Sequence, residues 1–346
     1  MINVILFSGP ESYKAISMDV YAQNLFQNLC KLSGFNVQLF RPKDLRIPLV
    51  GKHLTYWIYY SFVAQRQKAD INHIIDHSLS HLISGFDSKK TVITCHDLIG
   101  LTVPKSIPFW KRKVFWKNVT RNLFKAHKII AISQCTKNDI LKYSSCRSEN
   151  IEVIYLGVGT GFRRIEKERC KGIFKFKKPA ILHVGDDIFY RNINSLIKAI
   201  IKLGRDIKFV NVGSISKSNL ILLKKLKIDF VSFRNLSEEE LVQVYNAVDL
   251  LVYPAWHTGF GLPVLEAMAC GCPVICSNTG ALPEAAGKAA IMVSPDDTKG
   301  LAKAIDMVLM SDDLRQELIE KGLSQVKKFS WEKTAMETAD VYRKIA

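Results

Sequence analysis

The chain has 346 residues, of which 48% are hydrophobic and 23% are charged, a composition typical of a globular protein with enough core for two domains of ordinary size. No apolar run reaches the roughly 18–20 residues that a spanning helix needs, which excludes an integral membrane protein. The formal charge of +17 favours an anionic partner, whether a nucleic acid, an anionic membrane surface or an anionic substrate.

The first half of the chain alternates between strand and helix signals. Short apolar runs bounded by polar turns predict strands, and apolar residues at helical spacing predict helices. Strands are predicted at residues 2–7, 37–40, 71–75, 91–95, 128–133 and 151–156, and helices at residues 17–32, 54–66, 108–126 and 136–143. Because strands that alternate with helices form a parallel sheet covered on both faces, we predict one Rossmann-like domain over residues 1–158.

A polar, basic and aperiodic segment follows, and we predict that residues 159–178 link two domains. The hexapeptide GVGTGF at residues 157–162 partly matches a dinucleotide-binding fingerprint. However, Phe162 occupies the third glycine position, and a charged segment follows where the helix of that motif would begin. We therefore expect no dinucleotide cofactor.

The second half of the chain repeats the alternation. Strands are predicted at residues 180–184, 207–213, 228–233, 249–253, 273–276 and 289–293, and helices at residues 193–203, 237–247, 298–310 and 312–329. Ser237 and Glu240 have the spacing of a capping box, which marks a helix start. Residues 179–330 are therefore predicted to form a second Rossmann-like domain, and residues 331–346 a final helix.

The stretch from residue 249 to residue 293 has the densest functional signals. Gly259 and Gly261 allow backbone N–H groups to approach a ligand closely, and Pro263 suits the first turn of a helix. The positive end of that helix would attract an anion. Glu266 lies one turn further along, where a carboxylate can accept hydrogen bonds from two neighbouring hydroxyls. This spacing suits a ribose diphosphate.

The sequence GFGLPVLEAMACGCPVI, followed by GALPEAAG, resembles the donor site of family 4 retaining glycosyltransferases. The resemblance implies the α/β GT-B fold, in which two Rossmann-like, doubly wound domains face a central cleft. It also implies that the domain at 1–158 binds the acceptor and that the domain at 179–330 binds the nucleotide sugar. The helix at 331–346 would cross back to the first domain.

The reaction that this resemblance implies moves a sugar from a nucleotide diphosphate sugar to a hydroxyl of a glycan or lipid-linked saccharide in surface polysaccharide synthesis. The anomeric configuration would be retained, and the enzyme would be a hexosyltransferase that needs neither a metal nor a cofactor. The alternative is a catalytically silent GT-B protein that acts as a binding or regulatory subunit.

The resemblance also assigns donor-binding residues. Glu266 matches the second glutamate of the family's Glu-x7-Glu motif, which holds the donor ribose. Arg191 stands where the family has a phosphate-binding lysine, and its planar guanidinium suits a phosphate at least as well. Gly185 ends a strand, where we expect free N–H groups to bind an anion. The other predicted donor-binding residues are Gly259, Phe260, Gly261 and Leu262.

Two residues are predicted to be catalytic and to face the transferred sugar. His96, in the sequence TCHDL, matches a family histidine near the reacting carbon. Thr258 takes the place of the first glutamate of Glu-x7-Glu, and it offers a hydrogen bond but no charge. Asp186 stands where many members have arginine, which adds an anion beside the expected diphosphate.

Weaker signals predict acceptor-binding residues in the first domain. Asp76 and His77 follow a strand, and Lys14 replaces part of a glycine pair that the family has after its first strand. His73, His77 and His81 have the i, i+4 spacing that is also seen in metal sites on helices. We interpret them instead as surface histidines at a helix start, and we expect no metal.

Residues 105–128 interleave aromatic and basic side chains, which suits the surface of an anionic bilayer, although the aromatic residues equally suit the core face of a helix. Eight scattered cysteines and the lack of a secretory signal favour reduced thiols and a cytoplasmic enzyme, with the inner face of the membrane as a second location. Cys270 and Cys272 lack a second pair of ligands, so zinc is not expected. The sequence has no RNA- or DNA-binding motif, so no nucleic-acid partner is expected.

Overall fold

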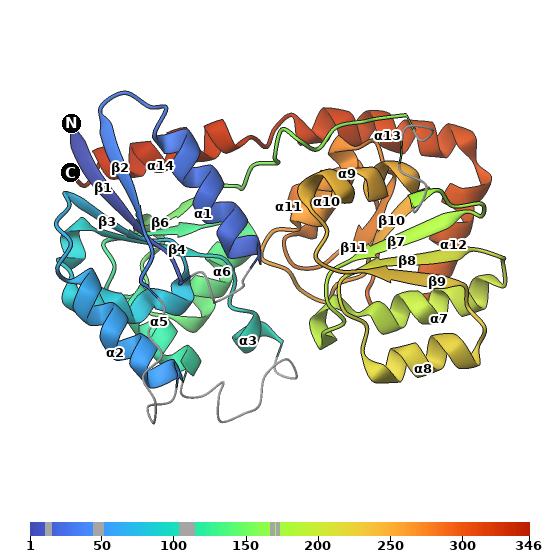
Figure 1. Ribbon diagram of the computed structural model, residues 1–346, viewed down its shortest axis with the longest axis horizontal. Coiled ribbons are helices and arrows are strands. Elements are labelled where there is room, and N and C mark those ends of the chain that lie inside the picture. The colour runs from blue at the N-terminus through green and yellow to red at the C-terminus, as the bar shows by residue number, and fades with distance from the viewer. Residues whose placement is uncertain (11–15, 44–51, 104–114, 167–169, 171–173) are drawn as a thin grey trace. The chain divides into compact units, whose positions relative to one another are not determined.

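The computed structural model describes residues 1–10, 16–43, 52–103, 115–166, 170 and 174–346. The chain divides into two compact units, one formed by Met1–Gly157 with Ser330–Ala346 and the other by Val158–Phe329. Among the described residues, each unit contains one parallel six-stranded sheet with helices on both faces (Figure 1). The predicted α/β class, with two Rossmann-like sheets, is confirmed.

The sheet of the first unit has the strand order β2-β1-β3-β4-β5-β6. Its strands are β1 (Ile2–Phe7), β2 (Phe35–Phe40), β3 (Ile71–Ile74), β4 (Thr91–Cys95), β5 (Lys128–Ala131) and β6 (Ile151–Val153). Its described helices are α1 (Ile16–Leu29), α2 (Lys52–Ala64), α3 (Ile99–Thr102), α5 (Lys117–Leu123), α6 (Gln134–Tyr143) and α14 (Trp331–Arg343).

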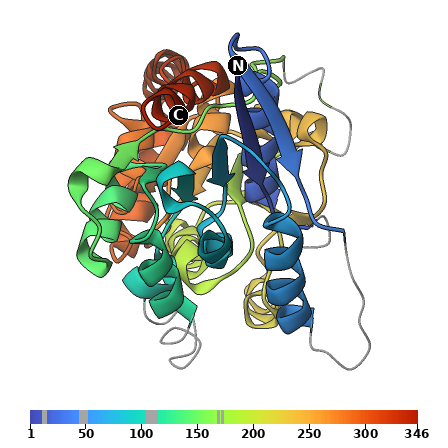
Figure 2. The ribbon, with the colours of Figure 1, turned by 90° about the vertical axis from the view of Figure 1, so that its left-hand side faces the viewer.

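These helices form two layers around the first sheet. Helices α2, α5 and α6 bury apolar side chains in one core with β1, β3, β4 and β5. Helix α1 packs against α14 on the other side of the sheet (Figures 1 and 2). The last helix of the chain therefore belongs to the same unit as the first strand.

A buried polar network fixes α14 to this sheet. His73 on β3 is fully buried, and its Nδ1 lies 2.6 Å from the Tyr342 hydroxyl of α14. Its Nε2 lies 2.8 Å from Oγ1 of Thr94 on β4, which in turn lies 2.9 Å from the Tyr21 hydroxyl of α1. Burial lowers the pKa of His73 to about 3, so the ring is neutral near pH 7. The interpretation of His73 as a surface histidine is therefore wrong.

The sheet of the second unit has the strand order β12-β11-β10-β7-β8-β9. Its strands are β7 (Ala180–Val184), β8 (Lys208–Val212), β9 (Phe230–Phe233), β10 (Leu250–Tyr253), β11 (Val274–Ser277) and β12 (Ile291–Val293). Its described helices are α7 (Ile193–Leu203), α8 (Lys217–Lys225), α9 (Glu238–Ala247), α10 (Leu262–Ala269), α11 (Leu282–Ala286), α12 (Thr298–Met310) and α13 (Asp312–Val326). Figure 1 shows α7 and α8 on one face of this sheet and α9 and α10 on the other.

Helix α8 was not predicted from the sequence. Its apolar residues are consecutive (Leu220–Leu223) and therefore give no clear helical period. The available signal was the cap, because the hydroxyl of Ser216 accepts a hydrogen bond from Asn219 N at 3.3 Å. The capping box of Ser237 and Glu240 at the start of α9 is present as predicted.

Only part of the basic stretch 105–128 can be compared with its prediction, because residues 104–114 lie outside the described residues. The helix there is α5, which begins at Lys117. Trp116 is buried at 4% exposure and lies in the core, whereas Phe124 is 57% exposed. Among the described residues, no helix is both long and apolar enough to cross a membrane.

Candidate functional site

Three loops of the second unit meet at the carboxyl edge of its sheet. They follow β7, β10 and β11, which are neighbouring strands in the order β11-β10-β7. Trp256 N, in the loop after β10, donates a hydrogen bond to Tyr190 O in the loop after β7, at 2.8 Å. Ala281 N, in the loop after β11, donates to Thr258 O at 3.2 Å. The predicted donor-binding residues of these loops are therefore brought together.

The glycine turn before α10 is tightly packed. Gly261 caps the helix with φ of 104°, and a Cβ at this position would lie 2.8 Å from the side chain of Leu282. A Cβ on Gly280 would lie 2.8 Å from Thr258 N, so the two loops touch through backbone. Phe260 is buried at 2% exposure, and its ring packs against that of Phe329 with centroids 5.6 Å apart. The turn leads directly into the first turn of α10. Pro263 has no N–H there and Val264 N donates to Gly261 O at 3.0 Å, so Leu262 N is left without a hydrogen bond to a described residue.

Glu266 lies one turn into α10, as the sequence predicts. Its Oε2 accepts a hydrogen bond from the hydroxyl of Tyr245 on α9 at 2.8 Å. Burial raises the pKa of Glu266 to about 7; the Tyr245 hydrogen bond opposes this rise, and the nearby carboxylate of Glu238 adds to it. Oε1 makes no hydrogen bond to any described residue. The carboxyl group is therefore held at one oxygen and open to a ligand at the other.

Arg191 ends a short 3-10 turn after β7 (Phe189–Arg191), and its side chain folds back over Gly185. Its Nη1 donates to the Tyr253 hydroxyl at 2.8 Å and to Val184 O at 3.3 Å. A Cβ on Gly185 would lie only 2.2 Å from the same Nη1. Gly185 is therefore the residue whose missing side chain makes room for the guanidinium.

The expectation of free N–H groups is wrong for Gly185 itself and for Asp187. Gly185 N donates to Val212 O at 2.7 Å, and Asp187 N donates to Ser214 O at 2.9 Å. The reason is that the backbones after β7 and β8 continue to pair beyond the ends of the two strands. Positive charge at this edge comes from the Arg191 side chain, and Leu262 N at the start of α10 is an N–H group that makes no hydrogen bond to a described residue.

Asp186 also has a structural role in this loop. Its Oδ1 accepts hydrogen bonds from the hydroxyl of Ser214 at 2.6 Å and from Ser214 N at 2.8 Å. These hydrogen bonds lower the pKa of Asp186, and the positive charge of Arg191 acts in the same direction. The anion thus ties the loop after β7 to the loop after β8.

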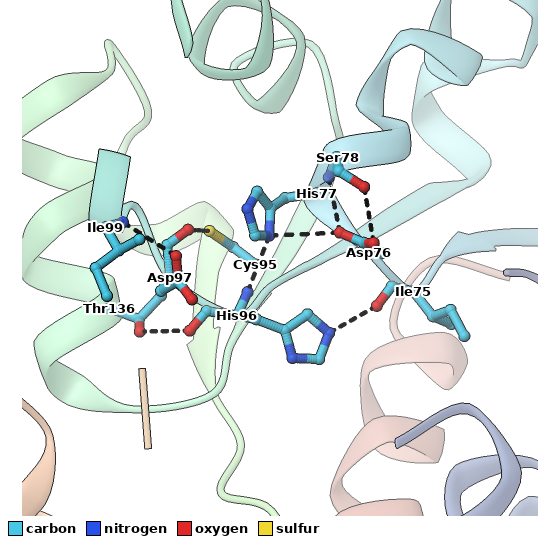
Figure 3. A network of polar contacts seen from close by, with 9 residues as sticks. All are labelled: Ile75, Asp76, His77, Ser78, Cys95, His96, Asp97, Ile99 and Thr136. Atoms are coloured by element: carbon cyan, nitrogen blue, oxygen red, sulfur yellow. Dashed lines mark hydrogen bonds and ion pairs between the residues drawn. The ribbon is translucent and has the colours of Figure 1, made fainter. Parts of the chain in front are cut away.

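His96 lies in the first unit, directly after β4, and is buried at 4% exposure. Its Nε2 lies 2.8 Å from Ile75 O, as Figure 3 shows. Because a carbonyl oxygen only accepts, Nε2 carries the hydrogen. Burial lowers the pKa of His96, so the ring is neutral near pH 7. Its Nδ1 then keeps a lone pair, and it makes no hydrogen bond to any described residue.

Asp76 and His77 lie beside His96 (Figure 3). Nδ1 of His77 accepts a hydrogen bond from His96 N at 3.3 Å, which requires that Nδ1 carry no hydrogen. Both oxygens of Asp76 accept from Ser78, at 2.8 Å from its backbone N and at 2.7 Å from its hydroxyl. Asp76 thereby caps the 3-10 helix His77–Gly85.

The histidines of this helix differ from their interpretation as surface residues. His77 is buried at 6% exposure, because its ring stacks on Trp116 with centroids 5.6 Å apart. His81 is half-buried. The third predicted acceptor-binding residue, Lys14, lies outside the described residues.

Sequence reasoning missed the two tyrosines that hold the predicted donor-binding side chains. Tyr245 contacts Glu266 from 21 residues away, and Tyr253 contacts Arg191 from 62 residues away. Neither tyrosine belongs to a recognisable motif. The only signal was that Tyr253 ends a buried strand directly before the glycine turn.

Two parallel sheets covered by helices, with a glycine turn, a carboxyl and an arginine at the carboxyl edge of the second, are the features that the resemblance to two-domain sugar-transfer enzymes implied. The family model described as Glycosyltransferase Family 4 matches residues 18–162, and the one described as Glycosyl transferases group 1 matches residues 164–325. Together these matches take in most of the chain. The chain belongs to the family 4 glycosyltransferases.

Curated relatives include two mannosyltransferases of Escherichia coli. The chain is 26% identical to O-antigen chain mannosyltransferase B over 270 residues, which are 74% of this chain and 70% of that protein. It is 29% identical to the serotype-specific mannosyltransferase WbdA over 265 residues, which are 71% of this chain but only 32% of WbdA. The chain thus matches about a third of the length of WbdA.

Solved structures identify the fold as GT-B. Sucrose-phosphate synthase from Thermosynechococcus elongatus matches with a TM-score of 0.82 and 19% identity, covering 100% of this chain and 99% of that one. Anabaena Alr3699/HepE, solved in complex with UDP-glucose, matches with a TM-score of 0.78 and 15% identity, covering 99% and 100%. At these identities the likeness concerns the fold alone.

Proposed function

We propose that this glycosyltransferase transfers a hexose from a nucleotide diphosphate sugar to a hydroxyl of a growing glycan or lipid-linked saccharide, with retention of anomeric configuration. The observation that carries the proposal is the carboxyl edge of the second sheet. There the carboxyl group of Glu266, which the protein hydrogen-bonds at one oxygen, lies near the glycine turn and Arg191. One unit therefore offers partners for a diol and for a diphosphate.

The names of the relatives support the choice of substrates. Two of them are mannosyltransferases, one of which acts on the O-antigen chain, and a protein of the same fold binds UDP-glucose. We propose a surface polysaccharide as the destination of the sugar. The names specify mannose for the curated relatives and UDP-glucose for the solved structure, and we propose to test both uridine and guanosine diphosphate sugars.

Each site residue has a proposed role. Glu266 accepts hydrogen bonds from the ribose hydroxyls. Arg191 and Leu262 N at the start of α10 stabilise the charge of the departing diphosphate, as fixed dipoles and cations do for leaving groups in general. His96 presents an unprotonated Nδ1 to a sugar hydroxyl.

Thr258 would hydrogen-bond the sugar at the position where relatives carry a charge. Replacing a charge-assisted hydrogen bond by a neutral one costs on the order of 1 kcal/mol in transition-state stabilisation. We therefore propose a slower enzyme or a different sugar preference, not a lost activity. No metal and no cofactor enter the proposed reaction.

Asp76 and His77 remain proposed acceptor contacts, as does Lys14. The basic residues of the stretch 105–128 would bring the enzyme to an anionic membrane surface on the cytoplasmic side, next to a lipid-linked acceptor. Exposed Phe124 is the described residue that supports this contact.

The first test is calorimetry with UDP, GDP, UDP-glucose and GDP-mannose, on the wild type and on Glu266→Ala. We expect one base to bind, with affinity reduced about tenfold or more in the variant because two hydrogen bonds to a carboxylate are lost. Glu317→Ala is the matched control, since Glu317 is an exposed carboxylate of the same unit that pairs with Lys321 on the surface of α13.

Transfer is then measured with the donor that binds, and the configuration of the product is read by NMR. Binding with turnover and retained configuration supports the proposal. Binding without hydrolysis or transfer would instead favour a silent binding or regulatory subunit. A wild type that binds no nucleotide at all would refute the donor site.

A further inference from the structure

The guanidinium of Arg191 is held by contacts within the protein. Its Nη1 has two protein acceptors, the Tyr253 hydroxyl at 2.8 Å and Val184 O at 3.3 Å. The bare backbone of Gly185 forms the surface on which it lies, because a Cβ there would be 2.2 Å from Nη1. The carbonyl and the glycine are backbone features, whereas Tyr253 contributes a side chain, whose hydroxyl accepts from Nη1 and whose ring centroid lies 6.0 Å from Cζ of Arg191. The side chain of Tyr190 is a second partner of the guanidinium.

Tyr253 is itself held rigidly. It ends β10, is 3% exposed, and its ring stacks on the ring of His183 with centroids 6.2 Å apart and an interplanar angle of 14°. His183 is fully buried on the neighbouring strand β7. The tyrosine ring therefore has a flat aromatic surface behind it and cannot turn away from the arginine without disturbing the core.

The protonation of His183 follows from its partner on β8. Nδ1 of His183 lies 2.9 Å from Oδ1 of Asn211, whose Nδ2 donates to Gly213 O at 2.9 Å and to Ser232 Oγ at 3.3 Å. The amide oxygen only accepts, so Nδ1 carries the hydrogen. Burial lowers the pKa of His183 to about 4, so near pH 7 the ring is neutral and adds no second cation.

We propose that Tyr253 is a positioning residue for the diphosphate of the donor: through its hydroxyl it sets the guanidinium of Arg191, and through its ring it connects that guanidinium to His183 and Asn211 in the core. The chain of contacts crosses three adjoining strands, β8, β7 and β10, and ends at the cation. This inference rests on the proposed function, because it assigns the diphosphate to Arg191.

The physical reason is preorganisation. An arginine side chain has many rotamers, and holding it before the ligand arrives removes the ordering cost from the binding step. Tyr253→Phe keeps the ring stacked on His183 and deletes only the hydroxyl. Arg191 then loses one of its side-chain partners, the Tyr253 hydroxyl, and is held less firmly over Gly185.

The test compares ligands with and without the diphosphate. Affinities of UDP and GDP are measured by calorimetry, and those of uridine and guanosine by ligand-observed NMR, for the wild type and Tyr253→Phe. We expect the diphosphate that binds to lose about tenfold in affinity and the corresponding nucleoside to change less than twofold. Tyr143→Phe, a half-buried tyrosine of α6 in the other unit, makes the same chemical change away from the site.

A double-mutant cycle with Arg191→Met completes the test. If Tyr253 acts through Arg191, the Tyr253→Phe loss disappears in the Arg191→Met background. Equal losses for nucleoside and diphosphate, additive losses in the cycle, or unchanged diphosphate affinity in Tyr253→Phe would each overturn the positioning role while leaving the donor site standing. A wild type that binds none of the four ligands would overturn the proposed function and this inference together.

Discussion

At the scale of single residues, the ionisation of Glu266 has a consequence for donor binding. Two ribose hydroxyls donate to a carboxylate, so the ligand favours the ionised form, yet burial raises the pKa of this group to about 7 in the protein. Ligand binding must therefore release a proton below that pKa. Affinity for the donor should increase with pH, by up to about tenfold per unit below pH 7, and level off above it.

The measurement uses a nucleotide sugar, because its diphosphate has no ionisation in this range, whereas a terminal phosphate titrates near pH 6. Calorimetry from pH 5.5 to 8.5 in two buffers of different ionisation enthalpy gives the affinity and the protons released. Glu266→Gln should bind weakly and show neither effect. Equal wild-type affinity at pH 5.5 and 8.5 would contradict the assignment of Glu266 to the ribose.

The same shift affects stability in the opposite sense. The folded-state pKa of Glu266 lies above its ordinary value of 4.5. Between pH 4.5 and pH 7 the folded state therefore binds more protons than the unfolded state, and the contribution of this residue to stability decreases as pH rises. A bound donor reverses this loss, since it supplies partners for the charge. Thermal unfolding with and without donor should therefore diverge most above pH 7.

At the scale of elements, the turn before α10 depends on glycine for two separate reasons. Gly261 has φ of 104°, which L side chains rarely adopt, and a Cβ would meet the side chain of Leu282 at 2.8 Å. Gly204, at the end of α7, has φ of 63° and nothing within 4 Å of a Cβ. A side chain at Gly204 would meet backbone strain alone, whereas a side chain at Gly261 would meet backbone strain and a steric clash.

We expect Gly204→Ala to lower the free energy of unfolding by about 1 kcal/mol, from backbone strain alone. Gly261→Ala should lower it by about 2–4 kcal/mol, because strain and overpacking add, and should also displace the start of α10 and weaken donor binding. Urea unfolding and calorimetry on both variants give the comparison. Equal losses of stability, with donor affinity unchanged in both, would show that the turn tolerates a side chain.

Elements such as β7, α7 and α12 could be predicted with both ends as found, because their apolar residues keep a regular period between clear turn and cap signals. Helix α8 could not, since its apolar run has no period. The residue types at Glu266 and Arg191 follow from the motif. Their partners Tyr245 and Tyr253 do not, because those contacts arise only when strands and helices distant in sequence are packed together.

The histidines show the same limit. His73 lies on β3, within the strand predicted at residues 71–75, and points into the core, whereas His77 begins the 3-10 helix. The i, i+4 spacing of these histidines therefore did not mark a shared helix face. A polar side chain can face the core only where another part of the fold supplies a hydrogen-bond partner for it. For His73 the partner is Tyr342, 269 residues away in the last helix.

At the scale of the whole molecule, each unit contains a fully buried neutral histidine. The folded pKa is about 3 for His73 in the first unit and about 4 for His183 in the second, against an ordinary value of 6.5. Between pH 6.5 and these values the unfolded state binds one more proton per histidine than the folded state. The contribution of each neutral histidine to the free energy of unfolding is therefore complete above pH 6.5. As the pH falls it decreases by about 1.4 kcal/mol per pH unit for each histidine.

Between pH 6.5 and pH 5, His183 should thus lower the stability of the second unit by about 2 kcal/mol, and His73 should lower that of the first unit by as much. The first unit should lose more in total, because burial also lowers the pKa of His81, to about 4, and that of His96. Hydrogen–deuterium exchange, read peptide by peptide over β3 and β7, measures the two units separately. His183→Gln keeps an uncharged side chain that can donate a hydrogen bond to Asn211. We expect the variant to be less stable than the wild type at pH 7. Its stability at β7 should depend less steeply on pH, by about one proton, and the exchange of β3 should be unchanged. His127→Gln, at an exposed histidine, should flatten neither. An unaltered slope at β7 in His183→Gln would mean that His183 is already protonated in the folded protein, and the neutral ring behind Tyr253 would have to be abandoned.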